Sequence, residues 1–205
     1  MTKRLYVTLL AVPLAGGVSL AAPQATNGTE WTPYSAHYTE TVSSQGPSGN
    51  QTHKNSEVDE LRSEDGSVLS ISKVGGNEIK GKLWLASGEI DDLDYTRQQA
   101  IVSGHAPRTH LPVPKVSPTG NEVVAGLPCS DYPVSMRNGG GQLCVDVADD
   151  ILLKEEIHVD ANGVRTEYVK QASSVDLSTP VDSSKLRIPA NFKKLTVSPG
   201  GKKQQ

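Results

Sequence analysis

The sequence predicts a mostly β fold, a curved antiparallel sheet or half-open β barrel that forms one domain. Stretches with apolar residues at every second position recur along the chain, and turn sequences rich in Gly, Asn, Asp and Pro separate them. The 205 residues include 19 glycines and 13 prolines, a composition that favours many turns. Only 4% of the residues are aromatic, which argues against a stacking platform for nucleic-acid bases.

The first 21 residues have the pattern of a secretory signal peptide. Lys3 and Arg4 form a short positive segment, and Leu5–Leu14 follows as a mostly apolar run. This run is too short to span a bilayer, which needs roughly 20 apolar residues. The small residues Ser19 and Ala21 predict cleavage after Ala21. We therefore expect an exported protein, periplasmic or secreted, that does not span a membrane.

The remaining chain divides into three parts. Residues 22–33, rich in Pro, Asn, Thr and Gly, predict a flexible lead, and residues 34–195 predict a single β-rich domain. Residues 196–205 predict a disordered tail. The formal net charge is −3 and becomes more negative when the signal peptide is lost, so nucleic acid is a poor partner.

The first half of the domain contains four predicted strands in succession. Alternation begins at Tyr34 and continues to Val42, and residues 52–62 could pair back on this strand. A hairpin turn at 64–67 leads into a strand over 68–74. The next strand, over 79–86, places Leu83 and Leu85 on one face.

The middle of the chain is less regular. Residues 88–101 fit neither the helical nor the strand period, so a short strand and a helical turn are both compatible with them. Residues 105–120 contain four prolines, which predict a loop that crosses the surface.

Cys129 and Cys144 are the only cysteines, and in an exported chain a single pair predicts a structural disulfide. The segment Asn138–Gly141 predicts a turn that folds the chain back between them. In the chain-entropy model, a loop of this size contributes roughly 3 kcal/mol of stability.

The last part of the domain predicts two further strands. After a turn at 148–150, strict alternation places Leu153, Glu155, Ile157 and Val159 on one face of a strand. A turn at 160–163 leads into the return strand over 164–172.

Both ends of the domain resemble the periplasmic carriers of outer-membrane lipoproteins. Tyr34–Thr41 is similar to the first strand of these proteins, and Ile151–Glu156, Asp160–Gly163 and Leu186–Phe192 resemble their closing hairpin and their final Pro and Phe pattern. The resemblance implies a half-open barrel that holds acyl chains or other apolar ligands inside it. It covers the outer thirds of the domain, whereas the middle departs from the pattern.

A concave apolar face is the predicted ligand-binding site. Its expected lining residues are Leu83, Leu85, Leu153, Glu155, Ile157 and Val159, although the same apolar residues could instead form a packed core. Glu155 is costly on an apolar face unless it is paired or hydrated. It could pair with Arg165 or Lys170 of the return strand, or make a polar contact at the mouth of a cavity.

Other chemistry has weaker support. His105 and His110 lack further ligands at zinc spacing, and the Asp91, Asp92 and Asp94 group predicts a solvated acidic turn more than a calcium loop. No Gly-x-Ser-x-Gly motif is present. We therefore expect no catalytic residue, no metal and no cofactor. The sequence favours an envelope protein that binds a lipid or lipoprotein, with a sheet-edge module for another envelope protein as the alternative.

Overall fold

The computed structural model describes residues 31–74, 78–107 and 116–195. The predicted signal peptide, the predicted tail and His110 lie outside these residues, as does most of the predicted lead. Within the described ranges, no helix is long and apolar enough to cross a bilayer.

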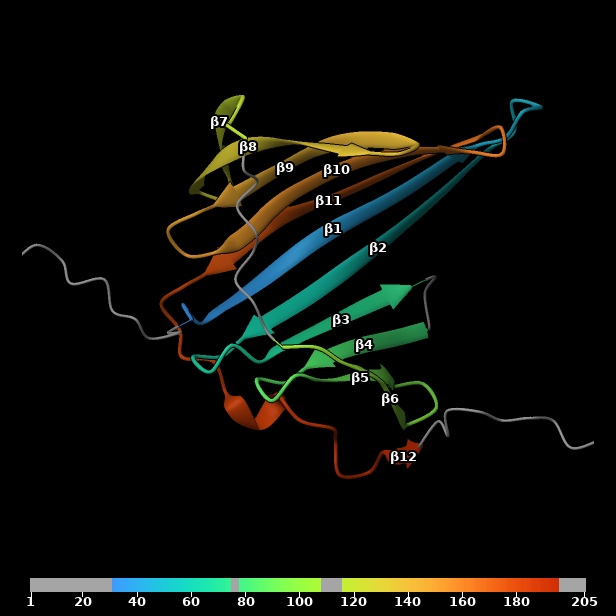
Figure 1. Ribbon diagram of the computed structural model, residues 1–205. Coiled ribbons are helices and arrows are strands. Elements are labelled where there is room, and N and C mark those ends of the chain that lie inside the picture. The colour runs from blue at the N-terminus through green and yellow to red at the C-terminus, as the bar shows by residue number, and fades with distance from the viewer. Residues whose placement is uncertain (1–30, 75–77, 108–115, 196–205) are drawn as a thin grey trace, which may run out of the picture.

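The protein is built on one open, curved sheet, which confirms the predicted fold class. Neighbouring strands are antiparallel except for β12, which pairs parallel to β6. The order across the sheet is β12-β6-β5-β4-β3-β2-β1-β11-β10-β9-β8-β7 (Figure 1). The strands are β1 (Tyr34–Gln45), β2 (Gln51–Arg62), β3 (Val68–Val74), β4 (Glu78–Trp84), β5 (Glu89–Asp94), β6 (Gln99–His105), β7 (Gly120–Val124), β8 (Leu127–Met136), β9 (Gly139–Asp146), β10 (Ile151–Ala161), β11 (Val164–Asp176) and β12 (Lys193–Leu195).

The structure resolves the ambiguous segment 88–101 into two strands, β5 and β6, joined by a turn. The strand period was not visible in β6 because the apolar residues Ala100, Ile101 and Val102 are consecutive, and only Ala100 is fully buried. The predicted solvated acidic turn is wrong, because Asp91, Asp92 and Asp94 lie within β5. Their side chains alternate between the two faces of the sheet, so Asp91 is completely buried while Asp92 is exposed.

The predicted glycine turn between the cysteines is also wrong in part. Gly139, Gly140 and Gly141 belong to β9, and the turn lies at Arg137 and Asn138. A Cβ atom on Gly141 would overlap the carbonyl oxygen of Glu156 in the adjacent strand. These glycines therefore permit a close approach of two strands, a role that a sequence pattern of consecutive glycines does not distinguish from a turn.

Two apolar clusters stabilise the sheet. The first joins Tyr34, Tyr38 and Val58 of β1 and β2 to Ile151 and Leu153 of β10, and it includes the disulfide. The second covers β3 to β6 on the outer side of the curve. There Leu69, Leu83 and Leu93 pack against the chain that follows β11, including Leu186 in the turn after the 3-10 helix η1 (Ser183–Lys185).

The predicted disulfide joins Cys129 of β8 to Cys144 of β9. Both cysteines are buried, at 4% and 1% exposure, so the bond lies inside the first cluster. The described chain also begins in contact with the sheet, because Trp31 is 5% exposed and its backbone N–H donates to the carbonyl of Glu64.

Candidate functional site

A cleft of about 450 Å³ lies on the inner face of the curved sheet. We call it the concave cleft; it is lined by Tyr34, Glu60, Arg62, Val68, Ser70, Lys82, Trp84, Asp150, Leu152 and Lys170. These residues come from strands as distant as β4 and β10, which are five places apart in the sheet. At roughly 4.8 Å per strand, that spacing would be about 24 Å on a flat sheet. One cleft contacts both strands because the sheet curls around it.

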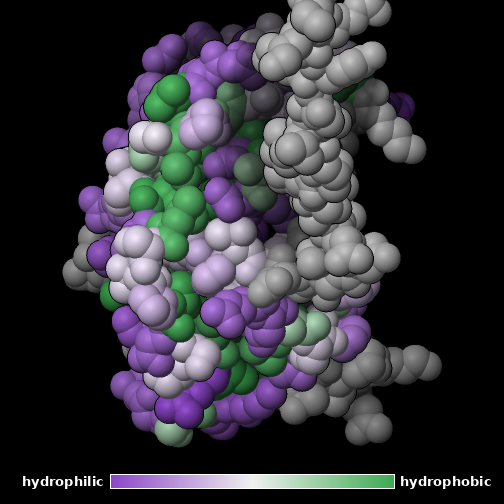
Figure 2. Space-filling model, turned by 90° about the vertical axis from the view of Figure 1, so that its left-hand side faces the viewer, coloured by the Kyte–Doolittle hydropathy of each residue, from purple (hydrophilic) through white to green (hydrophobic). Residues whose placement is uncertain are grey.

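One wall of the concave cleft is apolar. Val68 and Trp84 are opposite each other on β3 and β4, and Leu152 faces them from the start of β10. The indole Nε1 of Trp84 donates to the carbonyl of Ala106 at 2.8 Å, which satisfies its polar atom and holds the ring at the wall. Figure 2, which views the molecule from the left-hand side of Figure 1, shows apolar residues in a curved band between hydrophilic rims.

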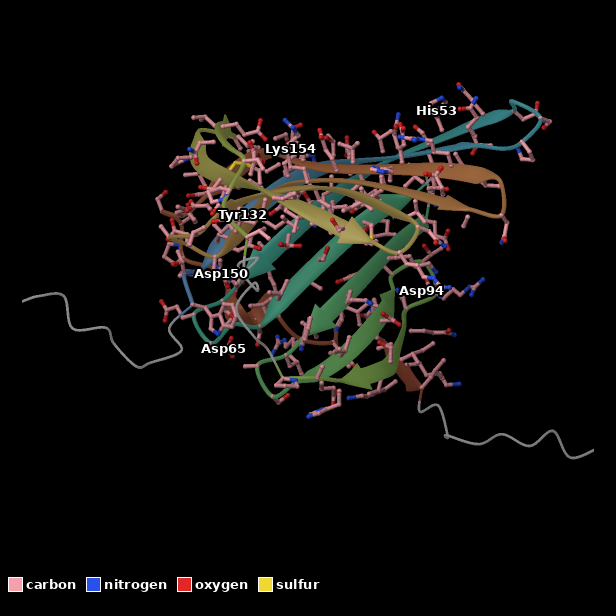
Figure 3. All side chains as sticks on the ribbon, turned by 45° about the horizontal axis from the view of Figure 1, so that its top comes forward. His53, Asp65, Asp94, Tyr132, Asp150 and Lys154 are labelled. Atoms are coloured by element: carbon pink, nitrogen blue, oxygen red, sulfur yellow. A yellow bond between two sulfur atoms is a disulfide. The ribbon has the colours of Figure 1, made fainter. Side chains whose placement is uncertain are left out.

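Arg62 closes the end of the concave cleft. Its side chain is 2% exposed and donates to three backbone carbonyls, those of Thr32, Asp149 and Asp150. The guanidinium also lies 4.6 Å from the centre of the Tyr34 ring, at cation–π distance. Asp150 and Asp65 belong to two turns far apart in sequence, and Figure 3 shows them at the same end of the strands. Arg62 therefore joins the segment before β1, β2 and the β9–β10 turn.

The floor of the concave cleft carries a charged network centred on Glu60. Its carboxylate accepts from the Tyr34 hydroxyl at 2.5 Å and from Lys170 Nζ at 3.4 Å. Lys170 Nζ also lies 4.3 Å from the centre of the Tyr38 ring. Burial, and then the Glu60 carboxylate, raise the pKa of both tyrosines well above the usual range. The tyrosines therefore act as hydrogen-bond donors at every physiological pH.

The network continues toward the far end of the strands. The Tyr168 hydroxyl and the Ser56 hydroxyl both donate to Glu40, at 2.9 and 3.1 Å. Glu155 lies directly opposite Lys170 in the β10–β11 pairing. Burial raises the pKa of Glu155, while the nearby Lys170 charge opposes the rise and the Glu40 charge adds to it. The inner face thus combines polar groups with apolar walls.

The structure brings only some of the predicted lining residues together. Glu155, Ile157 and Val159 pair with Lys170, Tyr168 and Thr166, which places all three on the inner face, beyond the residues that line the concave cleft.

Leu83 and Leu85 are on the other side of the sheet. Leu83 is fully buried in the second cluster with Leu69 and Leu93, whereas its neighbour Trp84 faces the concave cleft. Leu85 packs against the same cluster and lines a separate hollow of about 480 Å³ between the β2–β3 turn and the segment after β11. The prediction that Leu83 and Leu153 share a concave surface is corrected, because alternation fixes the relative faces within a strand but not which face is inside.

Leu153 departs from the strict alternation that we assumed. The β9–β10 register shifts between Leu152 and Lys154, so Leu153 is an extra residue in the strand. Leu153 is fully buried in the first cluster, while Leu152 lines the concave cleft. Arg165 does not reach Glu155 and pairs with Glu167 at 3.0 Å instead.

The concave cleft also contains residues that sequence reasoning missed. Arg62, Glu60 and Trp84 lie in predicted strands, but no local motif distinguishes them. The one available signal was the pair of opposite charges two positions apart in β2, Glu60 and Arg62, and such a pair is typical of any solvated strand face.

The described residues offer little to a metal ion. Among the described residues, one group of potential metal ligands lies close together, formed by Glu122, Cys129 and Cys144. The two cysteines are joined in the disulfide, so no thiolate is present there. Asp94 is engaged by Lys80 at 2.6 Å, and His105 is exposed on β6.

Comparison with known proteins identifies the fold. No model of a known protein family matches the sequence, and no curated protein sequence matches it. Among solved structures, an uncharacterized conserved protein from Thermus thermophilus aligns with 81% of this chain and 91% of that chain, with 13% identity and a TM-score of 0.52.

Two further solved structures that are similar to this chain belong to proteins with descriptive names. The complex of MucA and MucB from Pseudomonas aeruginosa aligns with 80% of this chain and 58% of that chain, with 16% identity and a TM-score of 0.49. A putative outer membrane lipoprotein-sorting protein domain from Vibrio parahaemolyticus aligns with 77% of this chain and 90% of that chain, with 11% identity and a TM-score of 0.34. At 13% identity, the similarity to the Thermus thermophilus protein shows a shared fold and nothing beyond it. The curved, half-open sheet that the resemblance to lipoprotein carriers implied is the architecture that the structure has.

Proposed function

We propose that the protein binds an amphipathic ligand of the cell envelope, a lipid or the acylated part of a lipoprotein, in the concave cleft and performs no chemistry on it there. The observation that carries this proposal is the cleft itself, formed where β4 and β10 curl toward each other. Its volume of about 450 Å³ falls within the range of small-molecule sites.

The lining of the concave cleft suits a ligand with two chemical ends. Val68, Trp84 and Leu152 offer an apolar wall, while Glu60 and Lys170 offer charged groups that are 15% exposed and close to one another. An acyl chain would replace water along the wall, and its polar head would contact the charged floor. The network keeps its own charges paired in the absence of a ligand, which limits the cost of their burial.

A location outside the cytoplasm is part of this proposal. The buried disulfide is of the kind that persists in oxidising compartments, and the N-terminal sequence has the features of a signal peptide. A periplasmic or secreted protein would meet lipids and lipoproteins directly.

The alternative function is binding of another envelope protein through a sheet edge. The outer edge of β7 pairs with no other described strand, and Val123 of β7 is 70% exposed. Unpaired strand edges accept an added strand from a partner. This alternative places the partner on β7, far across the sheet from Trp84.

The test is a binding titration with dansyl-labelled undecanoic acid, whose fluorescence rises in an apolar site. We expect saturable binding by the native protein. Ser70 lines the concave cleft from the middle of β3, so Ser70→Trp should fill the cleft and weaken binding at least tenfold. The matched variant Thr39→Trp adds the same ring at an exposed position of β1 and should bind as the native protein does.

Absence of saturable binding by the native protein would refute the carrier proposal. Equal binding by the Ser70→Trp and native proteins would move the site away from the concave cleft. In either case, circular dichroism must first show that each variant retains the β signal.

A further inference from the structure

Three side chains with complementary chemistry lie in one row on the convex face of the sheet. Ser174 of β11 is directly opposite His37 of β1, and His37 is directly opposite Asp59 of β2. The three residues are distant in sequence and meet only because β1 lies between β2 and β11. Directly opposite residues in an antiparallel pair have Cβ atoms roughly 4.5–5.5 Å apart.

The row has the order of groups found in a serine hydrolase triad, with the histidine between the serine and the carboxylate. His37 Nδ1 lies 2.7 Å from Asp59 Oδ1. A carboxylate on Nδ1 fixes the imidazole tautomer that leaves Nε2 free to accept a proton. The second oxygen, Asp59 Oδ2, lies 3.7 Å from Lys73 Nζ, so the carboxylate has a partner on each side.

Ser174 is available to complete the row. It is exposed, and within the described chain its hydroxyl makes no hydrogen bond, so it is free to rotate toward the ring. Serine to histidine contacts are often longer before substrate binds and shorten in the complex. The neighbouring Ser173 is an extra residue in β11 and donates to the carbonyl of His37 at 3.1 Å, which ties the bulged backbone to the strand that carries the base.

A groove of about 450 Å³ surrounds the row, and Ser174, His37 and Asp59 all line it. Leu61, Leu69 and Ile71 form its apolar side on β2 and β3. Lys185 of η1 also lines the groove and carries a positive charge. An apolar side, a nucleophile with a base and a cation that line one groove are groups that ester hydrolysis can use.

We propose that this convex groove hydrolyses carboxylic esters with short or medium acyl chains. The Ser174 oxygen attacks the ester carbonyl while His37 Nε2 takes the hydroxyl proton, and the Lys185 ammonium stabilises the negative charge that develops on the carbonyl oxygen. The carbon–oxygen bond of the ester breaks, and the alcohol leaves with the proton from His37.

Water completes the cycle. It gives a proton to His37, attacks the acyl-serine, and releases the carboxylic acid as the proton returns to Ser174. Asp59 is a positioning residue, since it acts on the substrate only through the ring of His37.

This activity is separate from ligand binding in the concave cleft. The two sites lie on opposite faces of the sheet, because Asp59 and Glu60 are consecutive residues of β2 and their side chains point to opposite faces. Glu60 is the one lining residue that the two hollows share. The two proposals can therefore fail independently.

The test is hydrolysis of p-nitrophenyl butyrate by the purified protein, together with labelling by a fluorophosphonate probe mapped by mass spectrometry. We expect hydrolysis above the buffer rate and a label on Ser174. Ser174→Ala and His37→Gln should each lower the rate by at least about a hundredfold, the scale of nucleophile and base removal. The control variant Ser135→Ala removes an exposed serine hydroxyl from β8, away from the row, and should retain the native rate and the label on Ser174.

Asp59→Asn tests the positioning role, because it should lower kcat with little change in KM. A native rate equal to buffer, or a Ser174→Ala rate equal to the native rate, would overturn the proposal. So would a label on any serine other than Ser174. Binding of dansyl-labelled undecanoic acid should be the same in Ser174→Ala and the native protein, which shows that the variant is folded and that the concave cleft is intact.

Discussion

Replacing Arg62 with methionine should destabilise the protein by about 3–5 kcal/mol. Methionine is similar in length but donates no hydrogen bond, so the carbonyls of Thr32, Asp149 and Asp150 lose their shared donor. A buried group left without a partner costs about 1–3 kcal/mol. The saved desolvation of the guanidinium, which is 2% exposed, and partial entry of water offset part of that total. The remainder matches the loss seen when one member of a buried charged network is removed.

Urea unfolding followed by circular dichroism measures this loss. The midpoint should fall while the slope of the free energy of unfolding against urea stays the same, because the folded surface is unchanged. At about 2–4 °C per kcal/mol for a domain of this size, the melting temperature should fall by roughly 6–20 °C.

Arg165→Met is the matched control. Arg165 makes one ion pair with Glu167 on the surface, where the two side chains are 50% and 55% exposed. Its loss should be under about 1 kcal/mol. If both variants lose the same small amount, Arg62 does not hold the turns together and the reasoning is wrong.

Three further predictions concern stability. Replacing Cys129 and Cys144 with alanine should lower the free energy of unfolding by about 3 kcal/mol in a melting experiment, and added reductant should shift the native protein but not the variant. Gly141→Ala should cost about 1–3 kcal/mol by urea unfolding because its Cβ overlaps a neighbouring backbone, whereas Gly104→Ala, with only ordinary contacts, should cost under about 1 kcal/mol. Because the folded pKa of Glu155 is raised, the folded state holds this proton longer than the unfolded state does, so Glu155 lowers stability as pH rises from the ordinary carboxyl pKa through the raised one. Glu155→Gln should therefore gain melting temperature relative to the native protein at pH 7 and show less gain at pH 4; an equal difference at both pH values would contradict this.

The local sequence pattern was sufficient to predict the mostly β fold class, most of the turns and the disulfide. Alternation depends only on side chains within one strand, so the strand that begins at Tyr34 and the hairpin before Val68 were correctly predicted. The pairing of Cys129 with Cys144 followed because no other cysteine competes. The charged residues of the concave cleft followed from none of these patterns.

The tertiary structure decided which face is inside and which residues meet. Leu83 and Trp84 are neighbours that alternation separates correctly, yet only the curl of the sheet places Trp84 in the concave cleft and Leu83 under the segment after β11. The extra residue at Leu153 shifts the register of β10 against β9, so that Leu152 lines the concave cleft while Leu153 is buried in the first cluster.

Long-range pairing between strands explains the remaining features that the sequence did not predict. Arg62 reaches carbonyls that are 87 and 88 residues away in the chain, and His37 lies opposite Ser174 because β1 pairs with β11. Pairing between distant strands depends on which of several similar apolar faces are buried together, and that choice depends on the whole sheet. The sequence by itself therefore determined the mostly β class, many of the strands and their covalent link, whereas the curvature and register of the folded sheet determined both the concave cleft and the Ser174, His37 and Asp59 row.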